Sequence, residues 1–87
     1  MNNSPLSDDA SLPHNRQLLE TEITTINALL AATEAGIKAK MAAEDPARGI
    51  WFAQEIHQLQ QDKLVLQTRR ELRQVRIRRL LLEEAEA

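Results

Sequence analysis

The strongest candidates for chemistry in this 87-residue chain are arginines, six of which fall within residues 69–79 beside a single acidic residue, Glu71. Arg69, Arg73 and Arg76 are spaced i, i+4 and i+7, which places their side chains on one face of a helix. Guanidinium groups at this spacing can pair with carboxylates or with phosphates. We favour ion pairs with the chain's own acidic residues, or a solvated face, and keep an acidic protein partner and a nucleic acid as alternatives.

Residue types typical of catalytic and metal sites are sparse. The chain has no cysteine, which excludes a thiol nucleophile, a disulfide and a cysteine-type zinc site. Its two histidines are His14 and His57, and neither Glu55 nor Asp62 lies three or four residues from His57, as two metal ligands on one helix face would. We therefore expect no catalytic residue, no metal and no cofactor.

The elements that must position these side chains are helical. Three prolines and two glycines are too few for a turn-rich β fold. Between residues 14 and 43 there is no proline, and apolar side chains recur at alternating steps of three and four residues. This spacing predicts a first helix over about residues 14–43, with Ser11 or Asn15 as its N-cap. The residues on its apolar face are Leu19, Ile23, Ile26, Leu30, Thr33, Ile37 and Met41.

A break in this pattern follows the first helix. Proline suits the first position of a new helix, so we predict a turn at about residues 44–46 and a second helix over about residues 46–84. Asp45 is then the N-cap of the second helix, and Gly49 lies in its first turn. Residues 1–13 have few sizeable apolar side chains to offset the entropy cost of ordering, so we expect a flexible leader.

These elements predict an all-α fold, an antiparallel helical hairpin formed by residues 14–87. A turn this short leaves the second helix lying beside the first. The expected alignment places Leu59 opposite Leu30 and Arg70 opposite Leu19. In this alignment the end of the longer second helix overhangs the first by several turns.

The second helix has two apolar stripes, and a hairpin can cover only one of them. One stripe faces the first helix, whereas the other stripe, the overhanging end and a tryptophan at the hairpin tip have no cover within the chain. We expect another polypeptide to cover them, either a second copy in a coiled-coil or four-helix-bundle homodimer or a different protein. The residues predicted to form this protein interface are Trp51, Val65, Leu72, Val75, Ile77, Leu81 and Leu82.

One family of enzymes has a comparable outline. All-helical chorismate mutases resemble this chain in length and in their long first helix. The resemblance implies an active site on which several cationic side chains converge, including arginines of the first helix. The first helix expected here has Arg16 at its beginning, Lys38 and Lys40 at its end, and no cation between them. This difference predicts that the protein is not an enzyme.

Two functions remain. The first is a non-enzymatic interaction protein of the adaptor, inhibitor or assembly-chaperone type. In size and pattern the chain resembles the short helical-hairpin co-chaperones of bacterial secretion systems and small phage-encoded inhibitors. The alternative is an RNA-binding hairpin dimer, similar to the plasmid copy-control dimers that grip paired RNA loops, with Arg69, Arg73 and Arg76 as its binding face.

Composition bears on both functions. A formal charge of −2 opposes a generic nucleic-acid coat, although a local basic patch can still bind. The chain has neither a signal sequence nor an apolar run of the roughly 20 residues that a membrane span requires. We therefore expect a cytoplasmic protein that does not interact with a membrane.

Overall fold

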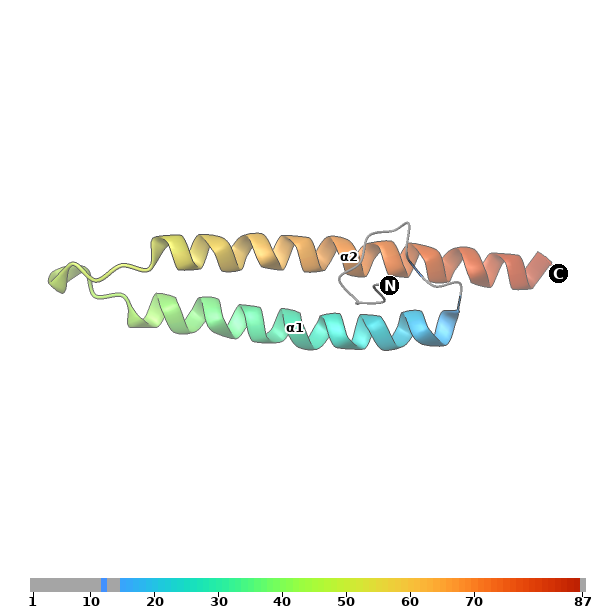
Figure 1. Ribbon diagram of the computed structural model, residues 1–87, viewed down its shortest axis with the longest axis horizontal. Helices are drawn as coiled ribbons and strands as arrows, with labels where there is room; N and C mark the ends of the chain where they lie inside the picture. Colours follow the sequence, from blue (N-terminus) through green and yellow to red (C-terminus); the bar gives the residue numbers. More distant parts are fainter. Residues whose placement is uncertain (1–11, 13–14, 87) are drawn as a thin grey trace.

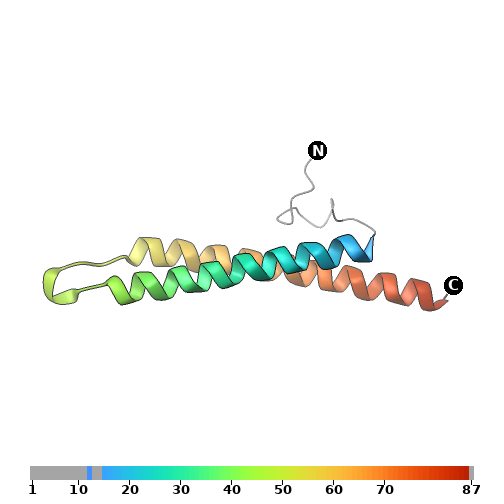
Figure 2. The same cartoon turned by 90° about the horizontal axis from the view of Figure 1, so that it is seen from below.

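The computed structural model describes Leu12 and residues 15–86. Two long helices, α1 (Arg16–Ala43) and α2 (Ala53–Glu86), run antiparallel and are joined by a turn that contains the short 3-10 helix η2 (Pro46–Arg48) (Figure 1). Seen after a 90° turn, the two helices still lie along each other and cross at a shallow angle (Figure 2). The predicted antiparallel helical hairpin is thus confirmed.

The start of α1 is set by Asn15. Its extended backbone (φ −118°, ψ 115°) stops the helix, and its side-chain Oδ1 accepts a hydrogen bond of 3.1 Å from the Leu18 N–H. An N-cap of this kind satisfies one of the amide groups that the first turn of a helix leaves without a partner. Asn15 is therefore the cap, of the two residues proposed from the sequence.

The predicted second helix begins too early, because residues 46–48 form a separate 3-10 turn and α2 starts only at Ala53. Gly49 ends this turn in the left-handed conformation (φ 70°), which glycine adopts without steric cost. Asp45 and Ile50 then pair through two backbone hydrogen bonds of 2.9 Å each. The Asp45 side chain makes no capping hydrogen bond; its Oδ2 lies 3.5 Å from Arg48 Nε, in an ion pair.

The chain between this paired turn and α2 is held by two contacts to α1 and its end. The Phe52 N–H donates a 3.0 Å hydrogen bond to the Glu44 carboxylate. The Lys40 ammonium lies 4.7 Å from the centre of the Phe52 ring, in the range of a cation–π contact. Phe52 is half-buried as a result. The turn is therefore a defined structure of nine residues, 44–52, rather than the three expected.

The longer turn changes the alignment of the helices. Leu59 lies against Gly36 rather than Leu30, and Arg70 donates a 2.9 Å hydrogen bond to Asn27 rather than facing Leu19. The difference is about one heptad, or two helical turns. A shift of one heptad preserves which faces meet, so the stripe predicted to face the first helix still does so.

The core between the helices is thin. Ile26, Leu30 and Leu66 form its buried cluster, with Leu19 buried further along α1. The molecule measures 64 × 25 × 14 Å, and its radius of gyration of 17.3 Å exceeds the roughly 12 Å expected for a compact domain of this length. More large hydrophobic side chains are exposed than buried among the described residues, and the exposed ones are Leu18, Leu29, Met41, Ile50, Trp51, Leu64, Val65, Leu81 and Leu82.

The predicted flexible leader, residues 1–13, falls outside the described residues except for Leu12, which is buried. In the part of the chain that is described, neither helix contains an apolar stretch long enough to cross a membrane.

Candidate interaction surface

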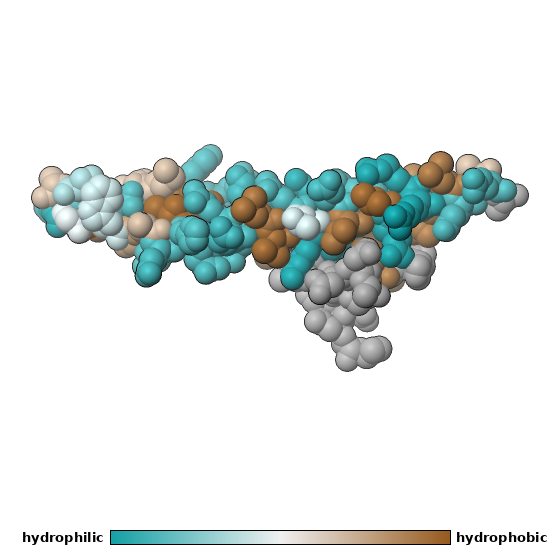
Figure 3. All heavy atoms as spheres, turned by 90° about the horizontal axis from the view of Figure 1, so that it is seen from above, coloured by the Kyte–Doolittle hydropathy of each residue, from teal (hydrophilic) through white to brown (hydrophobic). Residues whose placement is uncertain are grey.

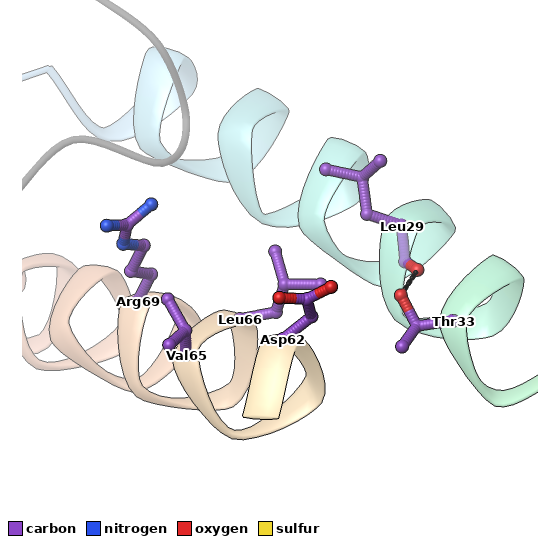
Figure 4. Close-up of a pocket in the computed structure, with 6 residues that line it drawn as sticks. All are labelled: Leu29, Thr33, Asp62, Val65, Leu66 and Arg69. Atoms are coloured by element: carbon purple, nitrogen blue, oxygen red, sulfur yellow. Dashed lines mark hydrogen bonds between the residues drawn. The ribbon is translucent and has the colours of Figure 1, made fainter. Parts of the chain in front are cut away.

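An open groove runs between α1 and α2 near the middle of the hairpin. Its volume is about 390 Å³, and two of its apolar side chains are substantially exposed, Leu29 at 39% and Val65 at 46%. Its walls come from both helices, with Leu29 and Thr33 on α1 and the other lining residues on α2 (Figure 4). We call it the Leu29–Val65 groove, and its lining residues are Leu29, Thr33, Asp62, Val65, Leu66 and Arg69.

The apolar surface continues beyond this groove along α2. A neighbouring hollow of about 300 Å³ shares Val65 and Arg69 with the groove and adds Leu64, Thr68 and Leu72. Val65 and Leu72 are one heptad apart, so the helix repeat places them in a row on the same face. The space-filling view likewise shows apolar side chains gathered in patches between polar ones along the hairpin (Figure 3). The structure thus brings together Val65, Leu72 and Arg69 of the residues predicted from the sequence.

The two threonine hydroxyl groups in this surface already donate hydrogen bonds within their own helices. The Thr33 hydroxyl donates a 2.8 Å hydrogen bond to the Leu29 carbonyl oxygen of its own helix. The Thr68 hydroxyl does the same to the Leu64 carbonyl oxygen at 3.0 Å. Because both hydroxyl protons are already used, an apolar group can lie against this surface without leaving a buried donor unsatisfied.

Charged side chains stand at the two ends of the groove. Asp62 and Arg69 are the first and last residues that α2 contributes, seven residues apart, with Val65 and Leu66 between them in the sequence. Figure 4 shows Arg69 at one side of the group and Asp62 beside Leu66. Asp62 accepts a 3.0 Å hydrogen bond from the Gln58 amide. Neither Asp62 nor Arg69 forms an ion pair with another of the described residues. The groove therefore has an apolar centre, an acidic end and a basic end.

Arg73 corrects the predicted arginine face. The alternative of a binding face formed by Arg69, Arg73 and Arg76 requires Arg73 to be accessible, but its side chain is 0% exposed. Its Nε donates a 2.9 Å hydrogen bond to the Glu22 carboxylate, and its Nη1 donates one of 2.8 Å to the Arg69 carbonyl oxygen. Arg69 and Arg76 are each half-buried. The three arginines therefore do not form one open cationic face.

Ion pairs between the helices were the favoured explanation of the arginines, and the Glu22–Arg73 pair confirms it for that residue. Arg16 on α1 also lies 4.0 Å from the Glu84 carboxylate on α2, with both side chains about half exposed or more.

The remaining predicted interface residues lie towards the two ends of the hairpin, away from the groove. Trp51 is 60% exposed in the turn before α2. Leu81 and Leu82 are exposed on the part of α2 that extends past the start of α1 in Figure 1, whereas Val75 and Ile77 are half-buried. Trp51 before α2 and the pair Leu81 and Leu82 near the end of α2 therefore line neither the groove nor the hollow beside it.

Sequence reasoning missed the contribution of α1 to the groove. Leu29 lies three residues after Ile26 and four before Thr33, but the predicted face contains its neighbour, the buried Leu30, and leaves Leu29 out. A large apolar residue next to a core position is the signal that would have identified it, because it widens the apolar surface beyond the seam. Asp62 was considered only as a metal ligand for His57.

The last feature of residues 15–86 to consider is the placement of side chains that could bind a metal ion. His57 is exposed on the surface beside Gln54, Glu55 and Gln58. The described residues include no group of three His, Asp or Glu side chains placed to hold a metal ion. Comparison of the chain with protein-family models, with curated proteins and with solved structures finds no match. The candidate site is therefore argued from its geometry alone.

Proposed function

We propose that this protein acts without catalysis, by binding a partner polypeptide along the face that contains the Leu29–Val65 groove. The observation that carries the proposal is the exposure of Leu29 and Val65 on the two walls of one groove. Full burial of an apolar side chain of this size is worth about 1.5–3 kcal/mol, and since less than half of each remains exposed, covering each of them contributes about 1 kcal/mol to binding. Side chains that stay in water on a thin hairpin are those that a partner would bury.

The shape of the surface favours a polypeptide over a small molecule. The groove is open along one side and continues past Thr68 to Leu72, so it does not enclose a compact ligand. In the described part of the chain, every buried side-chain nitrogen or oxygen already has a hydrogen-bond partner. The groove therefore offers no unpaired buried polar group that would bind a small polar ligand. A helix with apolar residues at steps of three and four fits an elongated apolar groove of this kind.

The alternative of RNA binding through the arginine face is less well supported. Tracking phosphates requires several cations accessible on one surface. Arg73, the central residue of the predicted trio, is buried against Glu22. Arg69 lies in the wall of an apolar groove. We therefore place the binding function in the groove, and measure RNA affinity only as a possible outcome of the tests below.

Val65→Asp tests the proposal. The substitution places a carboxylate in the middle of the surface, where burial without a partner is costly, so capture of any polypeptide bound there falls at least tenfold. The wild-type chain and the variant are immobilised, and the proteins that each retains, including free copies of the chain itself, are quantified. Gln60→Asp is the matched control, because Gln60 is exposed and lies about 140° from Val65 around the helix.

Circular dichroism must show the same helix content in both variants. Equal retention by the wild type and by Val65→Asp would contradict the proposal, as would equal losses in Val65→Asp and Gln60→Asp. Salt-sensitive RNA binding that survives Val65→Asp would instead move the function to the arginines.

A further inference from the structure

We propose that the polypeptide bound in the Leu29–Val65 groove is a second copy of this chain, packed antiparallel about a two-fold axis at the level of Val65. This inference rests on the proposed function and deepens it by naming the partner. It is carried by the distribution of charge along the groove.

The groove is complementary to its own copy. Asp62 lies three residues before Val65 and Arg69 four residues after it, so along α2 they are the first and last residues that line the groove. A 180° rotation about an axis through the middle of the groove brings Asp62 of one copy opposite Arg69 of the other, twice. Both charged groups are available for this contact, since neither has an ion-pair partner among the described residues.

The same order of charge extends one heptad in each direction. Glu55 precedes Asp62 by seven residues and Arg76 follows Arg69 by seven, so all four side chains lie in one row along α2. The first half of this row is acidic and the second half is basic. Rotation about Val65 therefore also brings Glu55 opposite Arg76. A parallel arrangement would place Asp62 against Asp62 and Arg69 against Arg69, which is repulsive.

The apolar centre of the face is large enough for such a dimer. The rotation brings Val65 against its own copy and the exposed Leu29 and Leu64 towards the centre of the contact. α2 has 34 residues and is about 50 Å long. Because the axis lies midway between Asp62 and Arg69, residues 53–78 of α2 face the α2 of the other copy, over about 39 Å. The face includes both helices of the hairpin, so a width of roughly 15 Å on each copy gives roughly 1,200 Å² in total, just above the area at which specific interfaces begin. The resulting assembly is a four-helix bundle of two hairpins.

Charge reversal at the two ends of the groove tests this arrangement. In Asp62→Arg, arginines face each other at both ends of the interface, and in Arg69→Glu, carboxylates do. Each replaces two attractions by two repulsions, so the dissociation constant of the homodimer rises roughly thirty-fold. An equimolar mixture of the two variants restores opposite charges at both ends, and dimer reappears at nearly wild-type affinity. Sedimentation equilibrium of the purified full-length chain measures all three samples.

Glu71→Arg and Arg78→Glu are the matched controls, because both residues are exposed on α2 and outside the groove. Their dimers keep wild-type affinity, and mixing them changes nothing. A wild-type chain that stays monomeric up to roughly 100 µM overturns the inference, as does a dimer unaffected by both reversals or not restored by mixing. If a monomeric chain still binds another protein in a Val65-dependent way, the proposed function stands and only the identity of the partner is wrong.

Discussion

The Glu22–Arg73 ion pair gives the most informative stability prediction. The Arg73 guanidinium is 0% exposed, whereas the Glu22 side chain is 16% exposed. Their 2.9 Å hydrogen bond joins α1 to α2. Glu22→Ala removes the carboxylate and leaves a buried cation with fewer partners.

The expected cost follows from this burial. Removing one partner of a buried ion pair costs about 3–5 kcal/mol, because the remaining charge is out of water without compensation. Arg73 keeps its hydrogen bond to the Arg69 carbonyl oxygen, and Glu22 is not fully buried, so the loss lies near the lower end, at about 2–3 kcal/mol. For a chain of this size, that lowers the midpoint of thermal unfolding by roughly 10–20 °C.

The measurement is thermal and urea unfolding followed by circular dichroism, at one fixed protein concentration because self-association would shift the midpoint. Glu20→Ala is the control, since Glu20 is exposed on the same helix and its loss changes stability by less than about 0.5 kcal/mol. Replacing both partners by apolar residues, in Glu22→Leu with Arg73→Met, recovers most of the loss. The reasoning is refuted if Glu22→Ala behaves like Glu20→Ala, or if the double variant is no more stable than Glu22→Ala.

Three further stability predictions concern two glycines and the N-cap of α1. Gly36→Ala raises the free energy of unfolding by about 0.5–1 kcal/mol, because alanine favours the helix and its Cβ atom would lie at an ordinary contact distance of 3.5 Å from Leu59 Cδ1. Urea unfolding measures the change. A loss of stability would mean that the packed helices cannot accept the methyl group. Gly49→Ala lowers stability by about 1–2 kcal/mol, since its φ of 70° is unfavourable for a residue with a Cβ even though the space around it is open. Asn15→Ala costs about 1 kcal/mol through loss of the N-cap bond to Leu18, whereas Asn15→Asp keeps an acceptor there and should retain most of it.

The helices and their facing stripes could be predicted because each rests on local information. The step of three and four residues from Leu19 to Ile37 specifies one face of α1 whatever the turn does. The turn could not be predicted from Pro46 alone, since proline begins a 3-10 turn as readily as an α-helix. The decisive residue was Gly49, whose freedom at positive φ ends η2 and moves the start of α2 to Ala53.

The candidate site was predicted only in part, for a related reason. Val65 and Leu72 follow from the second stripe of α2, but a groove also needs a second wall. Which residues of α1 form that wall depends on the alignment of the helices, and the predicted alignment was one heptad off. The same error hid the pairing of Arg73 with Glu22, because the predicted alignment places Glu22 beside the arginine-rich stretch but nearly two turns from Arg73.

Polar contacts, rather than apolar ones, determine the position of α2 along α1. The apolar stripes repeat every heptad, so sliding α2 by one heptad along α1 leaves leucines and isoleucines in contact. In the predicted alignment Arg70 lies against Leu19. In the structure it meets Asn27, while Lys63 lies 3.3 Å from Glu34.

These two contacts are themselves one heptad apart on each helix, from Lys63 to Arg70 and from Glu34 to Asn27. Arg73 adds a third polar contact, to Glu22, whereas the predicted alignment places Arg73 opposite Arg16, a residue of the same charge. Polar residues in a helical seam select one alignment by penalising the others. Matching the cations of α2 to the carboxylates and amides of α1, rather than maximising apolar contact, is therefore the rule that would have aligned this hairpin from its sequence.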